Sequence, residues 1–74
     1  MSYDYSKLLG KIKEELGCNY NLAVKLKLSE RTLSLKLNNK VDFRQNEINQ
    51  ICEILHINEK NIGDYFFAVE TQNN

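Results

Sequence analysis

A stretch near the middle of the chain, residues 30–38, carries side chains that can recognise the edges of base pairs. Nothing in it breaks a helix, and at about 100° per residue the face centred on Leu35 also presents Arg31, Thr32, Ser34 and Asn38. A guanidinium can bond guanine O6 and N7, an amide can pair with adenine, hydroxyls can bond bases or phosphates, and an aliphatic group can touch a thymine methyl. A solvated face would more often carry pairs of Glu and Lys.

Two helices joined by a tight turn would hold this face outward. We expect the first to start near Asn19 and the second to be capped by Ser29, whose side chain can accept from the backbone N–H of Thr32. Apolar residues at helical spacing would pack the two helices on each other: Leu22, Ala23, Leu26, Leu33 and Leu37.

These residues resemble the helix-turn-helix of the lambda-repressor/Cro family, through Ala23, Leu28-Ser29, Thr32-Leu33-Ser34 and Leu37-Asn38. The run KLNNK is similar to the variant common in small regulators of temperate phages. The resemblance extends over roughly residues 8–66. It implies an all-α fold, a single five-helix lambda-repressor-like helix-turn-helix domain over residues 1–70, with a short strand or extended tail at its C-terminal end. The last four residues, 71–74, are expected to be disordered.

The resemblance also implies roles for individual residues on a DNA operator. Base edges would be met by Glu30, Arg31, Thr32, Ser34 and Leu35. Phosphates would be met by Asn19, Lys36, Asn38, Lys40 and Arg44. Where the family usually has Thr-Gln this chain has Cys18-Asn19, so Asn19 either caps its helix or reaches the DNA. Glu30 either accepts from cytosine N4 or orients Arg31.

Charge is sorted along the chain although the net charge is +0. Residues 18–44 hold six cations and two anions, whereas residues 45–74 hold one cation and five anions. The positive region contains the helix that would read the bases. A neutral molecule therefore carries a local positive patch where DNA would bind. Ordinary charged helix faces are the alternative explanation.

The remaining segments read as helices around a common core. Tyr5, Leu9, Ile12 and Leu16 predict a first helix that ends at Gly17, with Leu8 widening its apolar stripe. Residues 45–55 predict another, with a stripe of Ile48, Ile51, Cys52 and Leu55. A short last helix is expected from Glu59 to about Tyr65.

The aromatic tail after that helix has two interpretations. Either the helix frays with Phe66 in the core, or residues 66–70 form a short strand. Three apolar residues are expected to be exposed and to contact a second copy of the chain: Ile54, Phe67 and Val69.

Several functional classes find no support in the sequence. There is one histidine, no glycine-rich phosphate loop and no metal-binding cysteine spacing, so we expect no enzyme, no cofactor, no metal site and no small-molecule ligand. No apolar run approaches the roughly 18 residues of a membrane span, and no signal-peptide core is present, which predicts a cytoplasmic bacterial protein without membrane contact. Cys18 and Cys52 are expected to be reduced.

The favoured interpretation is a sequence-specific regulator of transcription, Cro-like or repressor-like, that binds a double-stranded DNA operator as a homodimer and reads the major groove with helix 30–38. The alternative is a protein-interaction module that keeps the helix-turn-helix scaffold without sequence-specific DNA binding, because a fold does not determine a function.

Overall fold

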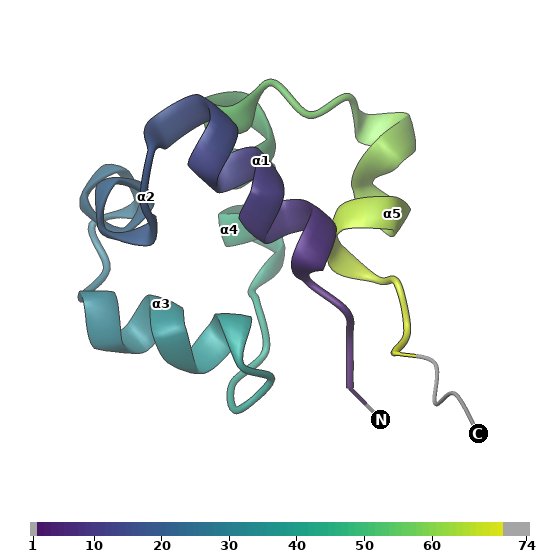
Figure 1. Cartoon of the computed structure of the whole chain (residues 1–74), viewed down its shortest axis with the longest axis horizontal. Coiled ribbons are helices and arrows are strands. Elements are labelled where there is room, and N and C mark those ends of the chain that lie inside the picture. The colour runs from purple at the N-terminus through teal and green to yellow at the C-terminus, as the bar shows by residue number, and fades with distance from the viewer. Residues whose placement is uncertain (1, 71–74) are drawn as a thin grey trace.

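The computed structural model describes residues 2–70, so the tail expected at residues 71–74 lies outside the described part of the chain. Five α-helices and one 3₁₀ turn follow one another: α1 (Ser6–Leu16), α2 (Asn19–Leu26), α3 (Glu30–Leu37), α4 (Gln45–Leu55), η1 (Glu59–Asn61) and α5 (Ile62–Phe66). The expected all-helical architecture with five helices is confirmed. In Figure 1, α1 crosses the centre of the molecule in front of α4, with α2 and α3 to the left and α5 to the right.

One hydrophobic core lies between the helices, and all five of them, α1 to α5, contribute side chains to it. Its fully buried large side chains are Leu8, Ile12, Leu22, Leu33, Ile51, Leu55 and Phe66. Each contributes about 1.5–3 kcal/mol by leaving water. The stripes predicted for α2, α3 and α4 are confirmed. The stripe predicted for α1 was wrong at one position, because Leu8 is buried and Leu9 is exposed. Leu8 comes three residues after Tyr5 and therefore lies on the same side of the helix, facing the core.

Aromatic rings close the core beside the chain ends. Phe43 packs edge-to-face against both Tyr5 and Phe66, with ring centroids 5.5 Å apart in each pair. This is the favoured geometry for aromatic rings. The Phe43 ring thus joins the loop before α4 to the start of α1 and to α5.

Within residues 2–70, three residues other than glycine adopt the left-handed backbone conformation that ends or reverses a helix. They are Lys27 (φ 59°), Asn39 (φ 63°) and His56 (φ 59°). Asparagine tolerates this region well, whereas lysine is strained there. Lys27 ends α2 where the resembled family often has glycine. The tight turn into α3 is therefore made at some conformational cost.

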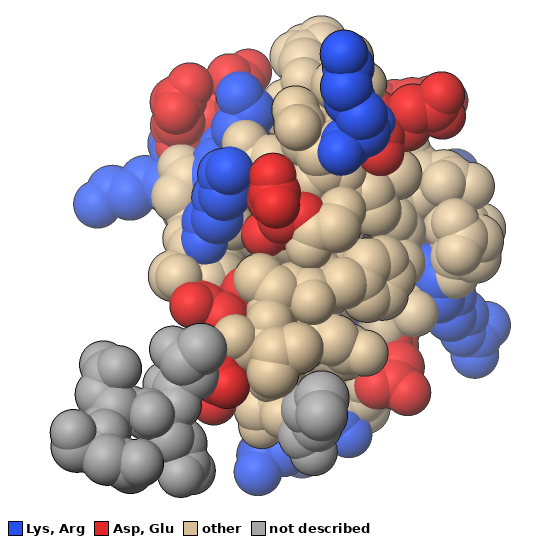
Figure 2. All heavy atoms as spheres, turned by 90° about the vertical axis from the view of Figure 1, so that its right-hand side faces the viewer, with Lys and Arg blue, Asp and Glu red and all other residues tan. Residues whose placement is uncertain are grey.

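The two ends of the described chain meet in an antiparallel pair. Tyr3 forms an isolated β-bridge with Val69, and the Asp4 and Glu70 N–H groups donate to the Ala68 and Ser2 carbonyls at 2.7 and 3.1 Å. The tail beyond α5 is thus extended, although the described residues form no full strand. Figure 2 views this side of the molecule and shows a broad uncharged surface with acidic and basic side chains around it.

Candidate nucleic-acid interface

The turn into α3 is held by the hydrogen bonds that the sequence predicts. Ser29 Oγ accepts from the Thr32 N–H at 3.0 Å and lies 2.8 Å from Thr32 Oγ1. A capped first turn satisfies a backbone donor that would otherwise face solvent or a ligand unpaired. The predicted cap is therefore confirmed, and it sets the start of α3 at Glu30, the residue after the cap.

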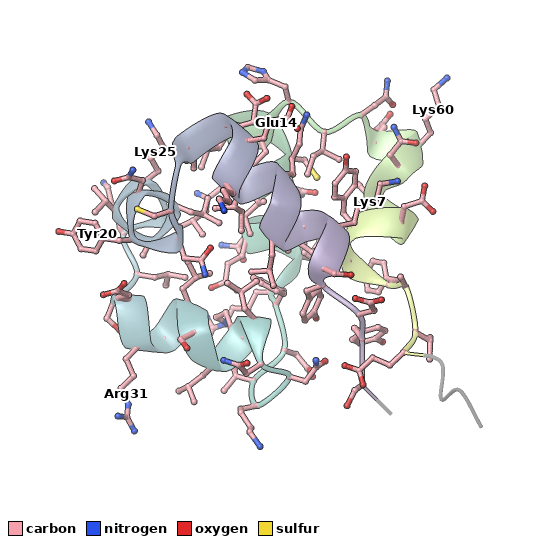
Figure 3. The ribbon with its side chains drawn as sticks, viewed as in Figure 1. Lys7, Glu14, Tyr20, Lys25, Arg31 and Lys60 are labelled. Atoms are coloured by element: carbon pink, nitrogen blue, oxygen red, sulfur yellow. The ribbon has the colours of Figure 1, made fainter. Side chains whose placement is uncertain are left out.

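The outer face of α3 carries a cation, a carboxylate and a hydroxyl. Glu30, Arg31 and Ser34 are exposed, while Thr32 and Leu35 are half-buried. Leu35 was expected to be freely exposed and is not, so only part of its side chain is available to a thymine methyl. Figure 3 shows Arg31 extending away from the body of the molecule.

The start of α2 lies beside this face. Asn19 is exposed and lines one shallow, open hollow together with Glu30, Arg31 and Ser34. The residue before it, Cys18, occupies the N-cap position of α2 without a side-chain hydrogen bond. Asn19 is therefore not the cap, which removes one of its two interpretations. Asn19 and Arg31 thus line the same open surface.

Lys36 does not belong to this surface. Its side chain is buried, with the residue only 3 % exposed, and its ammonium lies 2.9 Å from Glu47 Oε1 and 3.0 Å from the Asp42 carbonyl oxygen. A phosphate on the protein surface cannot reach it, so the expectation of a Lys36–phosphate contact is wrong. Position 36 comes three residues after the buried Leu33 and next to the buried Leu37, which places it on the inner side of α3.

Glu47 receives this ammonium and also completes the start of α4. Its Oε1 accepts from the Arg44 N–H at 2.8 Å. Burial alone would raise the pKa of Glu47, but the hydrogen bonds from Arg44 and Lys36, together with their positive charges, lower it below its ordinary value. Glu47 is thus charged at neutral pH and ties α3 to α4.

The other expected phosphate contacts lie near the end of α3 and the start of α4. Lys40 and Arg44 are exposed, and both side chains are open to an anion. Asn38 is also exposed, but its amide nitrogen donates to the Ser34 carbonyl at 2.8 Å and lies 3.2 Å from Ser34 Oγ. A phosphate would compete with these bonds for the Asn38 amide.

Two features of the surface were not anticipated. Asn39 uses its side-chain amide to bond both the N–H and the carbonyl of Tyr3, each at 2.9 Å, and so anchors the loop after α3 to the N-terminal segment. Tyr20 is exposed on α2 and points away from the core (Figure 3). No local pattern marks the Asn39 contact, because its partner is 36 residues away.

Comparison with known families decides where this chain belongs. Residues 1–69 match the model of a family described as a protein of unknown function, DUF739. The chain belongs to the DUF739 family. The match includes α1 to α5 and the whole surface described above, so that surface lies within the DUF739 region.

A solved structure is similar to this DUF739 chain over almost its whole length. It is the solution structure of the modulator of repression (MOR) of the temperate bacteriophage TP901-1 from Lactococcus lactis, with 50 % sequence identity, a TM-score of 0.81 and coverage of 97 % of each chain. No curated protein matches the chain. This DUF739 member is thus closely similar in sequence and fold to a small phage protein.

Metal ligands, membrane-spanning helices and reactive thiols can also be sought in the structure of the DUF739 chain. Within residues 2–70, no three His, Cys, Asp or Glu side chains lie together as metal ligands would. No helix of that part of the chain is long and apolar enough to cross a membrane. Cys52 is half-buried, and burial raises the pKa of its thiol, so it behaves as a packing residue.

Proposed function

We propose that this protein is a regulator of phage gene expression that binds double-stranded DNA in the bacterial cytoplasm. In this proposal residues 1–70 form a lambda-repressor/Cro-like domain, α2 and α3 are its helix-turn-helix, and α3 enters the major groove. The observation that carries the proposal is the joint exposure of Arg31, Ser34 and Asn19 around one open hollow.

This arrangement suits base recognition from the first turns of α3. Arg31 can direct two N–H groups at guanine O6 and N7, and the Ser34 hydroxyl lies one turn further along the same face. Thr32 contributes a half-buried hydroxyl that is already hydrogen-bonded to Ser29. Glu30 repels phosphate, so it contributes to selectivity by accepting from cytosine N4 or by orienting Arg31.

Phosphate contacts would hold α3 in register. Lys40 and Arg44 are exposed beyond the C-terminal end of α3, and Asn19 lies beside its first turn. Because Lys36 is neutralised by Glu47, the positive region keeps five available cations: Lys25, Lys27, Arg31, Lys40 and Arg44. Each phosphate that these side chains neutralise adds about 0.9 to the slope of log affinity against log salt.

The similarity to a phage modulator of repression supports the regulatory part of this proposal. A protein of that name acts within repression, and a chain 50 % identical to it over 97 % of its length is expected to act in the same kind of circuit. The exposed polar and charged side chains of α3 are the reason to propose DNA as the target. A homodimer would place two α3 helices on half-sites about 34 Å apart.

A selection of bound fragments from a random DNA pool tests the target directly. We expect a palindromic consensus whose affinity falls steeply with salt. Arg31→Ala should weaken binding to that consensus by about 1–3 kcal/mol and relax base preference at one position of each half-site. Lys60→Ala is the matched control, because Lys60 lies on the side of the molecule opposite Arg31 (Figure 3).

A second candidate is a protein-interaction module that modulates another regulator without reading DNA. The observation that favours it is electrostatic: the chain has no net charge, and Lys36 is withdrawn from the surface of α3. If the DNA pool yields no enrichment, or if Arg31→Ala binds specific and random DNA as the parent does, the DNA proposal is overturned in favour of this one.

A further inference from the structure

An open pocket lies between the two ends of the described chain and the loop before α4, apart from the surface of α3. Its volume is about 230 Å³. At about 30 Å³ for each water molecule in the liquid, this pocket has room for several of them. None of its lining residues belongs to the hollow that contains Asn19 and Arg31. A ligand held here would therefore leave the proposed DNA surface open.

Aromatic side chains form most of the pocket wall. Five rings follow one another in contact, with neighbouring centroids 5.5–6.1 Å apart: Phe67, Tyr3, Tyr5, Phe43 and Phe66. Phe66 and Ile48 are buried and form the floor, whereas Phe67 is 49 % exposed and lies at the mouth. The faces of aromatic rings carry negative charge density, so a wall of this kind attracts a cation.

Asp42 is the charged residue among those that line the pocket, and it lies at the mouth because its side chain is exposed. Its carboxylate forms no ion pair within residues 2–70. The Lys36 ammonium approaches the Asp42 carbonyl oxygen at 3.0 Å, but Glu47 neutralises that ammonium at 2.9 Å. The negative charge of Asp42 is therefore available to a ligand.

The hydroxyl of Tyr5 is another polar group of this pocket that lacks a protein partner. Tyr5 is only 7 % exposed, and its hydroxyl makes no hydrogen bond with residues 2–70. No fully buried side-chain N or O atom in that part of the chain lacks a partner, so the hydroxyl is still open to the pocket. Burial, followed by the nearby Tyr3 and Asp42, raises the pKa of Tyr5, so its hydroxyl keeps its proton at neutral pH.

We propose that this pocket binds a short aliphatic amine through its primary ammonium group. The ammonium would donate to the Asp42 carboxylate and to the Tyr5 hydroxyl oxygen, which uses two of its three N–H donors. Its carbon chain would lie on the rings of Phe43 and Phe66. A lysine side chain carries the same group, but the pocket has room for the whole of a short amine, and this favours a free molecule.

Charge and polarity disfavour other small molecules. The carboxylate and the ring faces repel an anion. A neutral apolar molecule would take Asp42 and Tyr5 out of water without giving either a partner, which costs free energy. Residues from separate segments of the chain form the walls, so no local pattern marks the pocket, and the sequence predicted no small-molecule ligand.

A titration of the full chain with n-butylammonium chloride at constant ionic strength, followed by ¹H–¹⁵N NMR, tests the proposal. We expect saturable shifts at the backbone amides of Tyr5, Asp42 and Phe43, and none at Arg31. For so small a ligand the Kd should be about 0.1–10 mM. 1-Butanol has the same chain without the charge and should bind at least about tenfold more weakly.

Two substitutions remove the two polar partners separately. Asp42→Asn should weaken butylammonium binding about tenfold, and Tyr5→Phe, which removes only the hydroxyl, about three- to tenfold. The matched control is Asp64→Asn, which makes the same change of charge at an exposed aspartate of α5 outside the pocket. It should bind as the parent does. A dispersed ¹H–¹⁵N spectrum establishes that each variant is folded.

Three results would overturn the assignment to an amine. They are no saturable shift at about 50 mM butylammonium, above the expected Kd, equal binding of 1-butanol, and equal binding by the Asp42 and Asp64 variants. Nα-acetyl-lysine methylamide carries the same ammonium on a peptide unit and should bind more weakly. Tighter binding than butylammonium would overturn the free amine in favour of a lysine of a protein partner. No DNA is present, so failure here is distinct from failure of the proposed function.

Discussion

Lys36 Nζ lies 2.9 Å from Glu47 Oε1, and the pair is buried between α3 and α4. This ion pair takes one cation out of the candidate DNA surface and uses it to orient the helix that carries that surface. The Asp42 carbonyl and the Arg44 N–H complete the network, so its polar atoms are satisfied. The direction in which α3 presents Arg31 and Ser34 therefore depends on a buried charge pair as well as on apolar packing.

Breaking this pair from one side should destabilise the fold strongly. Lys36→Met leaves the Glu47 carboxylate buried without its counter-ion, which typically costs about 3–5 kcal/mol. The double variant Lys36→Met/Glu47→Gln removes both charges and should recover most of that loss. Urea unfolding monitored by circular dichroism measures both. Lys40→Met, at an exposed lysine, should stay within about 0.5 kcal/mol of the parent. Equal effects at positions 36 and 40 would contradict the role of the pair.

Stability should fall in acid because of Glu47. Its folded-state pKa is lowered from the ordinary value of 4.5, so the carboxylate stabilises the fold above that pH. This contribution is lost as the pH falls below 4.5 and through the folded-state pKa. Glu47→Gln should be less stable than the parent at pH 7 and should lose less stability between pH 5 and about pH 3. Urea midpoints at the two pH values provide the comparison.

The Asp4 carboxylate contributes to the same acid dependence. Hydrogen bonds from the Ser6 hydroxyl and N–H lower its pKa as well. Glu47→Gln should therefore reduce the acid sensitivity without abolishing it. An identical loss of stability in the parent and the Glu47 variant would assign the pH dependence to other carboxylates.

The left-handed backbone at Lys27 should make this position better suited to glycine. A non-glycine residue there carries about 1–2 kcal/mol of local strain, which glycine would relieve. Glycine also makes the unfolded chain more flexible, and this entropy cost offsets part of the stabilisation. Lys27→Gly is therefore expected to raise the free energy of unfolding by about 0.5–1 kcal/mol. Lys25→Gly, two residues earlier inside α2, should lower it by about 1 kcal/mol. Destabilisation by both substitutions would rule out strain at Lys27.

The amide of Asn39 should stabilise the contact between the loop after α3 and the N-terminal segment. Asn39→Gly keeps the left-handed conformation (φ 63°) but loses both bonds to Tyr3. At about 0.5–1.5 kcal/mol for each hydrogen bond, the loss should be about 1–3 kcal/mol. Hydrogen exchange of the Tyr3 amide should accelerate in the variant, whereas the Thr32 amide, bonded to Ser29, should be unaffected. Unchanged exchange at Tyr3 would contradict the contact.

The helices could be read from local pattern because helix formation depends on neighbours in sequence. The stripe Ile48, Ile51 and Leu55 predicted α4, and Ser29 three residues before Thr32 predicted the start of α3. The exposure of Arg31 and Ser34 followed from the same periodicity, since Arg31 lies nearly opposite Leu33 and Leu37 and Ser34 flanks the same outer face. Each of these inferences needs only about 100° per residue and the hydrogen-bonding habits of one side chain.

The pairings between distant residues could not be read in this way. Lys36 lies near the boundary of the inner face of α3, and only the approach of α4 brings Glu47 to it. The bonds of Asn39 to Tyr3 arise because α1 and α5 bring the N-terminal segment past the loop after α3. Helical periodicity determines which side of each element is apolar. The tertiary packing decided which charge is buried, how much of Leu35 stays open, and that Tyr3 meets Val69, because those outcomes depend on how the elements meet in space.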